Sequence, residues 1–270
     1  KDDRGGLQYG DEAFQVAHKF PKVPVAVCEN RVTGVEQLLK TTKTDIVVLD
    51  DAFQHRRIHR DLDIVMVDGS RLPADDLLLP AGRLREPVRN LARAQAVIVT
   101  KVPDAEAATR AVRTLNGSRR GFRTAVFGLR PKAVQSVAED LAHPPSFLQN
   151  HPVHLFSGLG NNTAFAHTTR QLGATVLSHT TFPDHHAYKP ADIQKILAEY
   201  APETENKGKL APPLLLTTEK DFFRLKALGL LDHFSEVPLH YLQVKMVPEM
   251  GWEAIAAQIN ALIESNDNPN

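Results

Sequence analysis

The 270-residue sequence contains a single cysteine, Cys28, and so it cannot form an intrachain disulfide. A lone thiol is typical of a protein in a reducing, cytosolic compartment. No run of about 18 apolar residues occurs, so we expect no helix that spans a bilayer. The chain starts at Lys1, without a methionine and without a signal-peptide pattern. We therefore expect a soluble fragment of a longer natural protein.

Neither sign of charge is in excess, because Lys plus Arg and Asp plus Glu are 32 each. The net charge thus argues neither for nor against a nucleic-acid partner. Aromatic residues make up only 6% of the chain and are not interleaved with the basic ones, which disfavours an RNA-binding surface. Apolar residues at 42% and charged residues at 24% are ordinary for a globular protein of one large or two modest domains.

A complete phosphate-binding loop is also lacking. The pattern G-x-x-x-x-G-K-[ST] does not occur, and the one Gly-Lys step, Gly208-Lys209, is followed by Leu210. The segment SGLGNN at 157–162 has a glycine turn after a predicted strand, but it is only a fragment of a dinucleotide fingerprint. A tight backbone turn is its simplest interpretation.

Short apolar runs alternate with helical patterns in the first part of the chain. The predicted strands are residues 23–28, 45–49, 63–67 and 95–99, and the predicted helices are residues 11–19, 31–40 and 104–116. This alternation indicates an α/β fold with a mostly parallel sheet. Residues 69–93 form a long loop rich in Pro, Arg and Leu, and a loop of that length is usually functional.

The alternation begins again after residue 150. The predicted strands are residues 153–160, 174–182, 212–221 and 237–246, and the predicted helices are residues 163–172, 191–200, 222–228 and 252–265. We therefore predict a first α/β domain at 1–120, an extended linker at 121–138, and a second, smaller α/β domain at 139–270 that ends in a closing helix.

Two carboxylates follow a predicted buried strand. Residues 46–49 are an uninterrupted apolar run, and Asp50 and Asp51 come where the strand should end. Ligands of open α/β sheets bind at the carboxyl ends of the strands. A carboxylate there can hold Mg²⁺ beside a nucleotide phosphate. The same residues also fit a polar strand end before a turn, with residues 54–57 (QHRR) solvated.

Two further clusters have a structural and a functional interpretation. In GDEAF, Asp11 precedes a helical pattern, and a helix cap is its simplest role. In LLLPAGRLREP (77–87), prolines and glycine define a non-helical path that carries Arg83 and Arg85. Two arginines on a constrained loop suit phosphate oxygens, but a loop anchored by its leucines with solvated arginines fits equally well.

A histidine cluster lies in the second part of the chain. His179, Asp184, His185 and His186 suggest zinc, but no metal-ligand spacing accompanies them. A histidine beside an aspartate more often forms an orienting hydrogen-bonded pair.

Taken together and in this order, the motifs resemble those of the tetraacyldisaccharide 4'-kinases, the lipid A 4'-kinases of bacterial outer-membrane biosynthesis. The resemblance runs from about Gly10 to beyond Asp221 and rests on GDEAF, DDAFQHRR, LLPAGRLREP, RAQAVIVTK, FSGLGNN, FPDHHAY and TTEKD. Each motif is weak alone, whereas DDAFQH followed by LPAGRLREP is a specific combination.

The resemblance implies a phosphate-loop NTPase-like kinase domain, joined through a β-ribbon to a second, smaller α/β domain, with the active site between them. It implies transfer of the γ-phosphate of ATP, assisted by Mg²⁺, to the 4'-hydroxyl of a tetraacyldisaccharide 1-phosphate. The partner is then a lipid A disaccharide precursor and not a nucleic acid. Such an enzyme works in peripheral contact with the inner membrane, at its cytoplasmic face.

The resemblance also implies roles for single residues. Asp11 is the catalytic carboxylate near the acceptor hydroxyl, and His185 pairs with it from the second domain. Arg85 meets the transferring or product phosphate, and Arg31 contacts the phosphate already on the substrate.

The nucleotide and metal site is implied to lie in DDAFQH. Asp50 and Asp51 serve the metal, with Gln54 and His55 beside them.

One feature departs from the family, which has its glycine loop and a hydrophobic membrane-facing helix before the GDE motif. Only ten residues precede Asp11 here, so we expect this chain alone to bind ATP poorly and to be inactive. Two alternatives remain open. One is a metal-dependent phosphohydrolase that uses Asp50, Asp51 and the His185-His186 pair. The other is a non-catalytic module that binds anionic lipid or RNA through Arg56, Arg57, Arg83, Arg85, Arg89 and Arg93.

Overall fold

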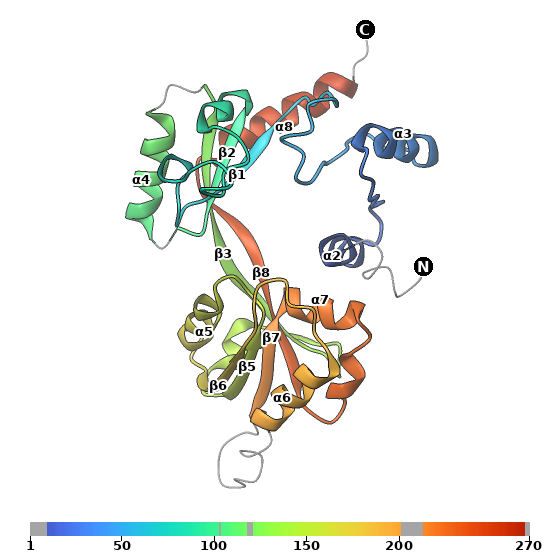
Figure 1. Ribbon diagram of the computed structural model, residues 1–270, viewed down its shortest axis with the longest axis vertical. Coiled ribbons are helices and arrows are strands. Elements are labelled where there is room, and N and C mark those ends of the chain that lie inside the picture. The colour runs from blue at the N-terminus through green and yellow to red at the C-terminus, as the bar shows by residue number, and fades with distance from the viewer. Residues whose placement is uncertain (1–9, 103, 118–120, 201–212, 268–270) are drawn as a thin grey trace. The chain divides into compact units, whose positions relative to one another are not determined.

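The computed structural model describes residues 10–102, 104–117, 121–200 and 213–267 (Figure 1). The chain divides into two compact units. The first unit comprises residues 1–44 and 131–244, and the second comprises residues 45–130 and 245–270. Strands β3 (Arg123–Ser136) and β8 (Leu239–Met250) are neighbours in the sheet, and each has residues in both units.

The second unit is built on a short parallel sheet. Strand β1 (Ile64–Asp68) pairs with β2 (Ala96–Thr100), and β2 pairs with the first part of β3, both in parallel. Alternate side chains of β2 enter two cores, because successive residues of a strand point to opposite faces. Val97 and Val99 pack with helix α4 (Ala105–Asn116), whereas Ala96 and Ile98 pack with Ile255 of helix α8 (Trp252–Asp267).

The first unit repeats this arrangement on a larger sheet. Its strands lie in the order β3-β8-β7-β5-β6, with β5 at Pro152–Ser157, β6 at Thr175–Thr181 and β7 at Leu214–Thr218. Strand β5 is parallel to both β6 and β7, β7 is parallel to β8, and the two-residue strand β4 (Ala142–His143) pairs with β3 in the antiparallel sense. All residues of β5 and β7 are buried, as expected for the central strands of a parallel sheet.

Helices cover both faces of this sheet. Helices α6 (Pro190–Tyr200) and α7 (Glu219–Ala227) pack on the face that presents Phe156 and Leu215. Helix α5 (Asn162–Gln171) packs on the face that presents Leu155 and Leu216. Two more helices belong to this unit, α2 (Asp11–Lys19) and α3 (Arg31–Thr41). The short 3-10 helices of the chain lie at Pro73–Asp75, Val88–Arg93, Pro145–Leu148 and Leu231–Phe234.

The predicted α/β class with a mostly parallel sheet is confirmed. The expected helices and six of the eight expected strands have counterparts in the structure. The predicted strands at 23–28 and 45–49 are wrong, because neither pairs with another strand in the part of the chain that the structure describes. Val48 is 88% exposed and Ile46 is 57% exposed. An apolar run becomes a strand only where a neighbour receives its backbone hydrogen bonds.

The predicted extended segment at 121–138 corresponds to β3. The compact units differ from the predicted domain boundaries in two segments. Residues 1–44 group with 131–244, and residues 245–270, which include α8, group with 45–130. The boundaries at 120 and 138 stay a prediction.

The central position of β7 leads to a stability prediction. Leu216 is fully buried there, so Leu216→Ala should lower the free energy of unfolding by about 2–5 kcal/mol, through lost transfer energy and the cavity left behind. Leu141→Ala is the matched control in the same unit, because Leu141 is 50% exposed and should change stability by less than about 0.5 kcal/mol. Urea unfolding followed by circular dichroism measures both. Equal losses in the two variants would contradict this account of the core.

Candidate functional site

Helix α7 begins with a side-chain cap that buries a carboxylate. Thr218, the N-cap residue, accepts a hydrogen bond from the backbone N–H of Asp221 at 3.1 Å. The hydroxyl of Thr218 donates in turn to Oδ2 of Asp221 at 2.7 Å. Thr218 therefore caps the helix through its hydroxyl, and the same hydroxyl fixes the carboxylate of Asp221. This cap explains why the helix starts at Glu219 and not at Phe222 as predicted, and it holds Asp221 with no exposed surface.

Arg224, one turn further along α7, is also buried, with 4% of its surface exposed. Its guanidinium donates to Oδ1 of Asp221 at 3.3 Å and to the carbonyl oxygen of Gly158 at 3.0 Å. A further contact, of 3.2 Å, joins Nη2 of Arg224 to Nδ1 of His185. The contacts with Gly158 and His185 tie α7 to the turn after β5 and to residues 182–189, the histidine loop, which follows β6.

Gly158 belongs to the SGLGNN segment, which is a tight turn as predicted. Its backbone N–H donates to Oδ2 of Asp221 at 3.0 Å. A Cβ atom at this position would lie 3.1 Å from Oδ1 of Asp221 and 3.2 Å from the carbonyl oxygen of Pro183. A larger residue would therefore be tight here, and its neighbours would have to shift by a few tenths of an ångström.

His185 is 59% exposed and has a left-handed backbone, with φ at 55°. Its Nε2 lies 3.4 Å from Nζ of Lys220 and 3.9 Å from Oδ2 of Asp184. Burial alone would raise the pKa of Asp184, but the positive charge of Lys220 and a hydrogen bond from the backbone N–H of His185 keep that pKa below its ordinary value. Asp184 is therefore ionised at neutral pH, beside the imidazole.

The other histidines of the cluster have separate partners. Nε2 of His186 lies 3.0 Å from Oδ2 of Asp192, and the ring of His186 stacks on Phe182. Nε2 of His179 lies 2.8 Å from the hydroxyl of Ser157, and burial lowers the pKa of His179. His185 and His186 are thus adjacent in sequence but are held by different groups.

Helix α2 packs against α7, and Asp11 is the first residue of α2. The N-cap residue is Gly10, so Asp11 does not have the predicted capping position, and its side chain lies outside the described part of the structure. Lys19 forms an ion pair of 2.8 Å with Glu219, which is 5% exposed. His18 packs edge-on against Phe223. The helix that starts at Asp11 and the loop that carries His185 therefore contact the same helix within one unit.

Arg31 is the first residue of α3, after the capping residue Asn30. The side chain of Arg31 donates to the carbonyl oxygen of Cys28.

The predicted nucleotide and metal residues lie in the second unit. Asp51 sits in a turn with φ at 47°, and both of its carboxylate oxygens accept from Nη1 of Arg85, at 2.7 and 2.8 Å. The pair is open to solvent, since Asp51 is 62% exposed and Arg85 is 57% exposed. Hydrogen bonding to Asp51 raises the pKa of Arg85. Asp50 and His55 are exposed beside them.

A second ion pair, between Glu86 and Arg93, holds the LREP loop and contacts DDAFQH through Gln54 and Phe53. Glu86 accepts from both terminal nitrogens of Arg93, at 2.8 and 3.0 Å, and also from Gln54 at 3.1 Å. Arg93 lies over the ring of Phe53 at 4.3 Å from its centroid. The hydrogen bonds from Arg93 lower the pKa of Glu86 to about 2. Gln54 is therefore tied to the LREP loop, and the Glu86–Arg93 clamp fixes the path of that loop.

Asp50 and Asp51 supply the oxygen ligands that Mg²⁺ prefers. In the described residues, no group of three or more His, Cys, Asp or Glu side chains gathers as a metal site. Mg²⁺ commonly takes only one or two carboxylates and completes its shell with water and phosphate oxygens. The two aspartates therefore fit a magnesium ion that is held jointly with a nucleotide.

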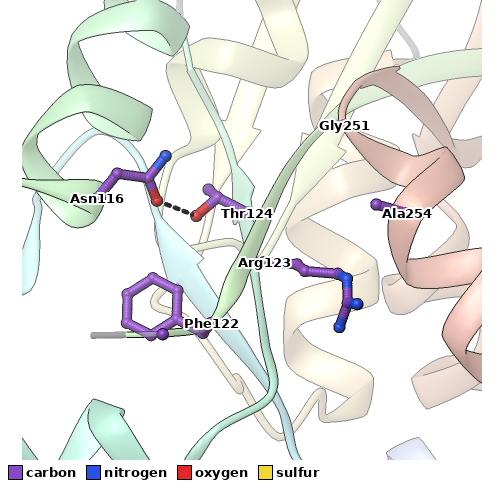
Figure 2. A pocket seen from close by; sticks show the side chains of 7 residues that line it. Asn116, Phe122, Arg123, Thr124, Gly251 and Ala254 are labelled. Carbon is purple, nitrogen blue, oxygen red and sulfur yellow. Dashed lines mark hydrogen bonds between the residues drawn. The ribbon is translucent and has the colours of Figure 1, made fainter. Parts of the chain in front are cut away.

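A pocket of about 420 Å³ also lies in the second unit, where β3 begins (Figure 2). Asn116 and Thr124 line it and are joined by a hydrogen bond of 2.8 Å. The start of α8 contributes Ala254. None of the predicted site residues lines this pocket.

The sequence patterns gave no supporting role to four residues, namely Asp221, Arg224, Glu86 and Arg93, and Arg93 was named only as a contact for anionic lipid or RNA. The signals were present. In TTEKDFFR, the T-x-x-D spacing predicts a cap, and Asp221 and Arg224 stand three residues apart on a helix. Glu86 and Arg93 bracket a 3-10 helix, and no pattern in the sequence indicates their pairing.

The clamp leads to a pH-dependent prediction. The pKa of Glu86 is lowered from 4.5 to about 2, so its ionisation stabilises the fold fully above pH 4.5, and this stabilisation is lost as the pH falls toward 2. Glu86→Gln should cost about 1–3 kcal/mol at neutral pH and flatten the loss of stability in that acid range. The free energy of unfolding, measured between about pH 7 and 2.5, tests both effects. Glu106→Gln, at an 83% exposed carboxylate of the same unit, is the control and should leave the wild-type profile unchanged.

Comparison with known proteins places these features in a family. The family model described as tetraacyldisaccharide-1-P 4'-kinase matches residues 1–264. The tetraacyldisaccharide 4'-kinase of Chlorobium limicola is 34% identical over 262 residues, which is 95% of this chain and 71% of the relative. The tetraacyldisaccharide 4'-kinase of Bacteroides thetaiotaomicron is 38% identical over 231 residues, which is 80% of this chain and 59% of the relative. The chain thus spans about three fifths to seven tenths of the length of these relatives.

A solved structure agrees with this result. The crystal structure of apo-form LpxK from Aquifex aeolicus in complex with ATP matches with a TM-score of 0.62 and 26% identity. The match covers 94% of this chain and 69% of that one. It confirms the predicted phosphate-loop NTPase-like α/β fold. Since the family model covers nearly the whole sequence and the fold agrees, the chain belongs to the tetraacyldisaccharide-1-P 4'-kinase family.

Proposed function

We propose that the protein transfers the γ-phosphate of ATP to the 4'-hydroxyl of a tetraacyldisaccharide 1-phosphate, a precursor of lipid A. The observation that carries this proposal is that α7 contacts both the helix that begins at Asp11 and the loop that carries His185. Helix α7 packs against α2, which begins at Asp11, and it contacts His185 through Arg224. The names of the relatives supply the reaction, and the shared contact with α7 supports a common site for these two residues.

Asp11 acts in this proposal as the carboxylate beside the acceptor hydroxyl. It accepts the proton as the new bond to phosphorus forms, and His185 orients it and tunes its basicity. Phosphoryl transfer has a loose transition state, so catalysis comes mainly from positioning and charge compensation. A histidine held on a helix-anchored network suits such a positioning role.

The second unit supplies the nucleotide side of the proposed reaction. Asp50 and Asp51 hold Mg²⁺ together with ATP, with Gln54 and His55 beside them. When bound, the metal neutralises charge on the phosphate oxygens and orients them. Arg85 pairs with Asp51, and this contact supports the proposal that its guanidinium meets the transferring phosphate beside the metal ligands.

Arg31 is proposed to contact the phosphate already present on the lipid. Because the acceptor is amphiphilic, we propose that the protein works in peripheral contact with the inner membrane, at its cytoplasmic face. No helix among the residues that the structure describes has the length and apolar character needed to cross a bilayer.

The role of Asp11 can be tested with the protein expressed from its complete gene. Asp11→Ala should lower kcat by about 10²–10⁴-fold while ATP affinity stays nearly unchanged, because the carboxylate acts on the acceptor and not on the nucleotide. Transfer of radiolabelled γ-phosphate to the lipid measures kcat, and calorimetry measures ATP binding. Asp45→Ala removes an exposed carboxylate and should behave like the wild type. An equal loss of ATP binding in Asp11→Ala would show that its role is assigned wrongly.

A second test concerns Arg85. Arg85→Lys should lower kcat/KM on the order of 100-fold, because an ammonium cannot reproduce the two-pronged contact of a guanidinium with phosphate. The same phosphoryl-transfer assay measures this change. Arg110→Lys, at a 60% exposed arginine of the same unit, is the control and should be neutral. Near-normal rates for Arg85→Lys would identify Arg85 as a surface arginine. Hydrolysis of simple phosphate esters without ATP would instead favour a phosphohydrolase.

A further inference from the structure

Arg224 joins three segments through one buried side chain. It donates to Asp221 on its own helix, to the carbonyl oxygen of Gly158 after β5, and to Nδ1 of His185 in the histidine loop. Asp221 is itself fixed by the hydroxyl of Thr218 and the backbone N–H of Gly158. Neither residue of the pair can change its rotamer without breaking several of these contacts.

The direction of the contact with His185 follows from chemistry. A guanidinium has only donors, so Nδ1 of His185 must accept. A neutral imidazole has one protonated and one unprotonated nitrogen, and its proton is therefore on Nε2. The Nε2–H group then faces the carboxylate of Asp184, whose Oδ2 lies 3.9 Å away. The side chain of His185 as a whole is 59% exposed.

Lys220 makes a competing contact that the same chemistry rejects. Its ammonium lies 3.4 Å from Nε2 of His185, but an ammonium also only donates. One neutral imidazole cannot accept at both nitrogens. The Arg224 contact is the shorter one and comes from a buried, fixed side chain, whereas Lys220 has an alternative partner in Asp184 at 3.5 Å.

A purely structural explanation of the Asp221–Arg224 pair is weak. Burial of two opposite charges costs desolvation energy that their attraction does not reliably offset, and apolar side chains of similar volume are often at least as stabilising. The pair also contacts a residue with a left-handed backbone, His185. Strained backbone of this kind persists where the surrounding contacts hold it and is concentrated at functional sites.

We propose that Asp221 and Arg224 are positioning residues that hold His185 in the tautomer with its proton on Nε2 and aim that nitrogen at the reaction. This inference rests on the proposed role of His185 in phosphoryl transfer. Neither residue needs to touch the substrate. Arg224 fixes which nitrogen carries the proton, and Asp221 fixes Arg224.

The tautomer can be observed directly in the 270-residue chain, without any enzymatic assay. Long-range ¹⁵N–¹H correlation spectra of the histidine side chains, recorded at about pH 8, where a free imidazole is neutral, distinguish the two tautomers. We expect the Nε2–H form for His185. In Arg224→Met the spectrum should shift toward a mixture that includes the Nδ1–H form. Arg170→Met, on α5 of the same unit, is the control and should leave His185 unchanged.

A second variant guards against misfolding of Arg224→Met, which leaves Asp221 as an uncompensated buried charge. The double variant Asp221→Asn/Arg224→Met removes both charges and should show the same shift in the His185 spectrum. A wild-type His185 in the Nδ1–H form would overturn the proposal. So would an unchanged spectrum in the folded double variant.

Kinetics separate this inference from the proposed function. In the protein expressed from its complete gene, the double variant should lower kcat by about 10- to 100-fold with little change in KM, because a misplaced catalytic group slows the chemical step. Suppose that the wild-type spectrum shows the Nε2–H form but His185→Ala leaves kcat unchanged. The proposed role of His185 in the reaction then fails, whereas the inference that Arg224 fixes its tautomer stands. If His185→Ala abolishes turnover but the double variant does not lower kcat, the positioning proposal fails alone.

Discussion

The buried pair of Asp221 and Arg224 is the constraint on which the first unit's polar site depends. It stands where three connections meet, namely the start of α7, the turn after β5 and the histidine loop. Because buried charges must be compensated, each of these segments is required to supply its partner at the right place. Gly158 fits this constraint, since a Cβ at that position would lie only 3.1 Å from Oδ1 of Asp221. The position of His185 fits it as well.

Three of the arginine–carboxylate pairs lie at the proposed site residues or support them. They differ in how much of their surface is exposed, and this difference separates fixed pairs from pairs that ligands can reach. Asp221–Arg224 is almost completely buried and Glu86–Arg93 is about a quarter exposed, so both are fixed parts of the structure. Arg85–Asp51 is more than half exposed. A pair of that kind contributes about 0–1 kcal/mol, so a phosphate or a metal ion can replace either partner at little cost. The two supporting pairs hold the loops, and the exposed pair remains available for ligands.

Much of this arrangement could be predicted from the sequence, for reasons that differ between residues. The central strands β5 and β7 are continuous apolar runs, and α4 has a capping aspartate and an apolar stripe, so local patterns sufficed. The segment at 46–49 has the same apolar pattern but no pairing partner among the described residues, and no local pattern reports that. The motifs also named His185 and Arg85 as candidates, and their roles stay a prediction. No local pattern predicts the contact between Arg224 and His185, because the two lie 39 positions apart and only the fold brings them together.

Exposed residues of the proposed site are supported by buried or half-buried ion pairs, and this arrangement suits phosphoryl transfer. Three residues of the proposed reaction, His185, Asp51 and Arg85, are more than half exposed. The residues that hold them are buried or half-buried. A loose transition state needs little covalent chemistry from the protein, so its contribution lies in the fixed placement of charges and hydrogen bonds. Rigid ion pairs beneath an exposed polar surface provide that placement, and they leave the surface groups free to exchange their present partners for a nucleotide or a lipid phosphate.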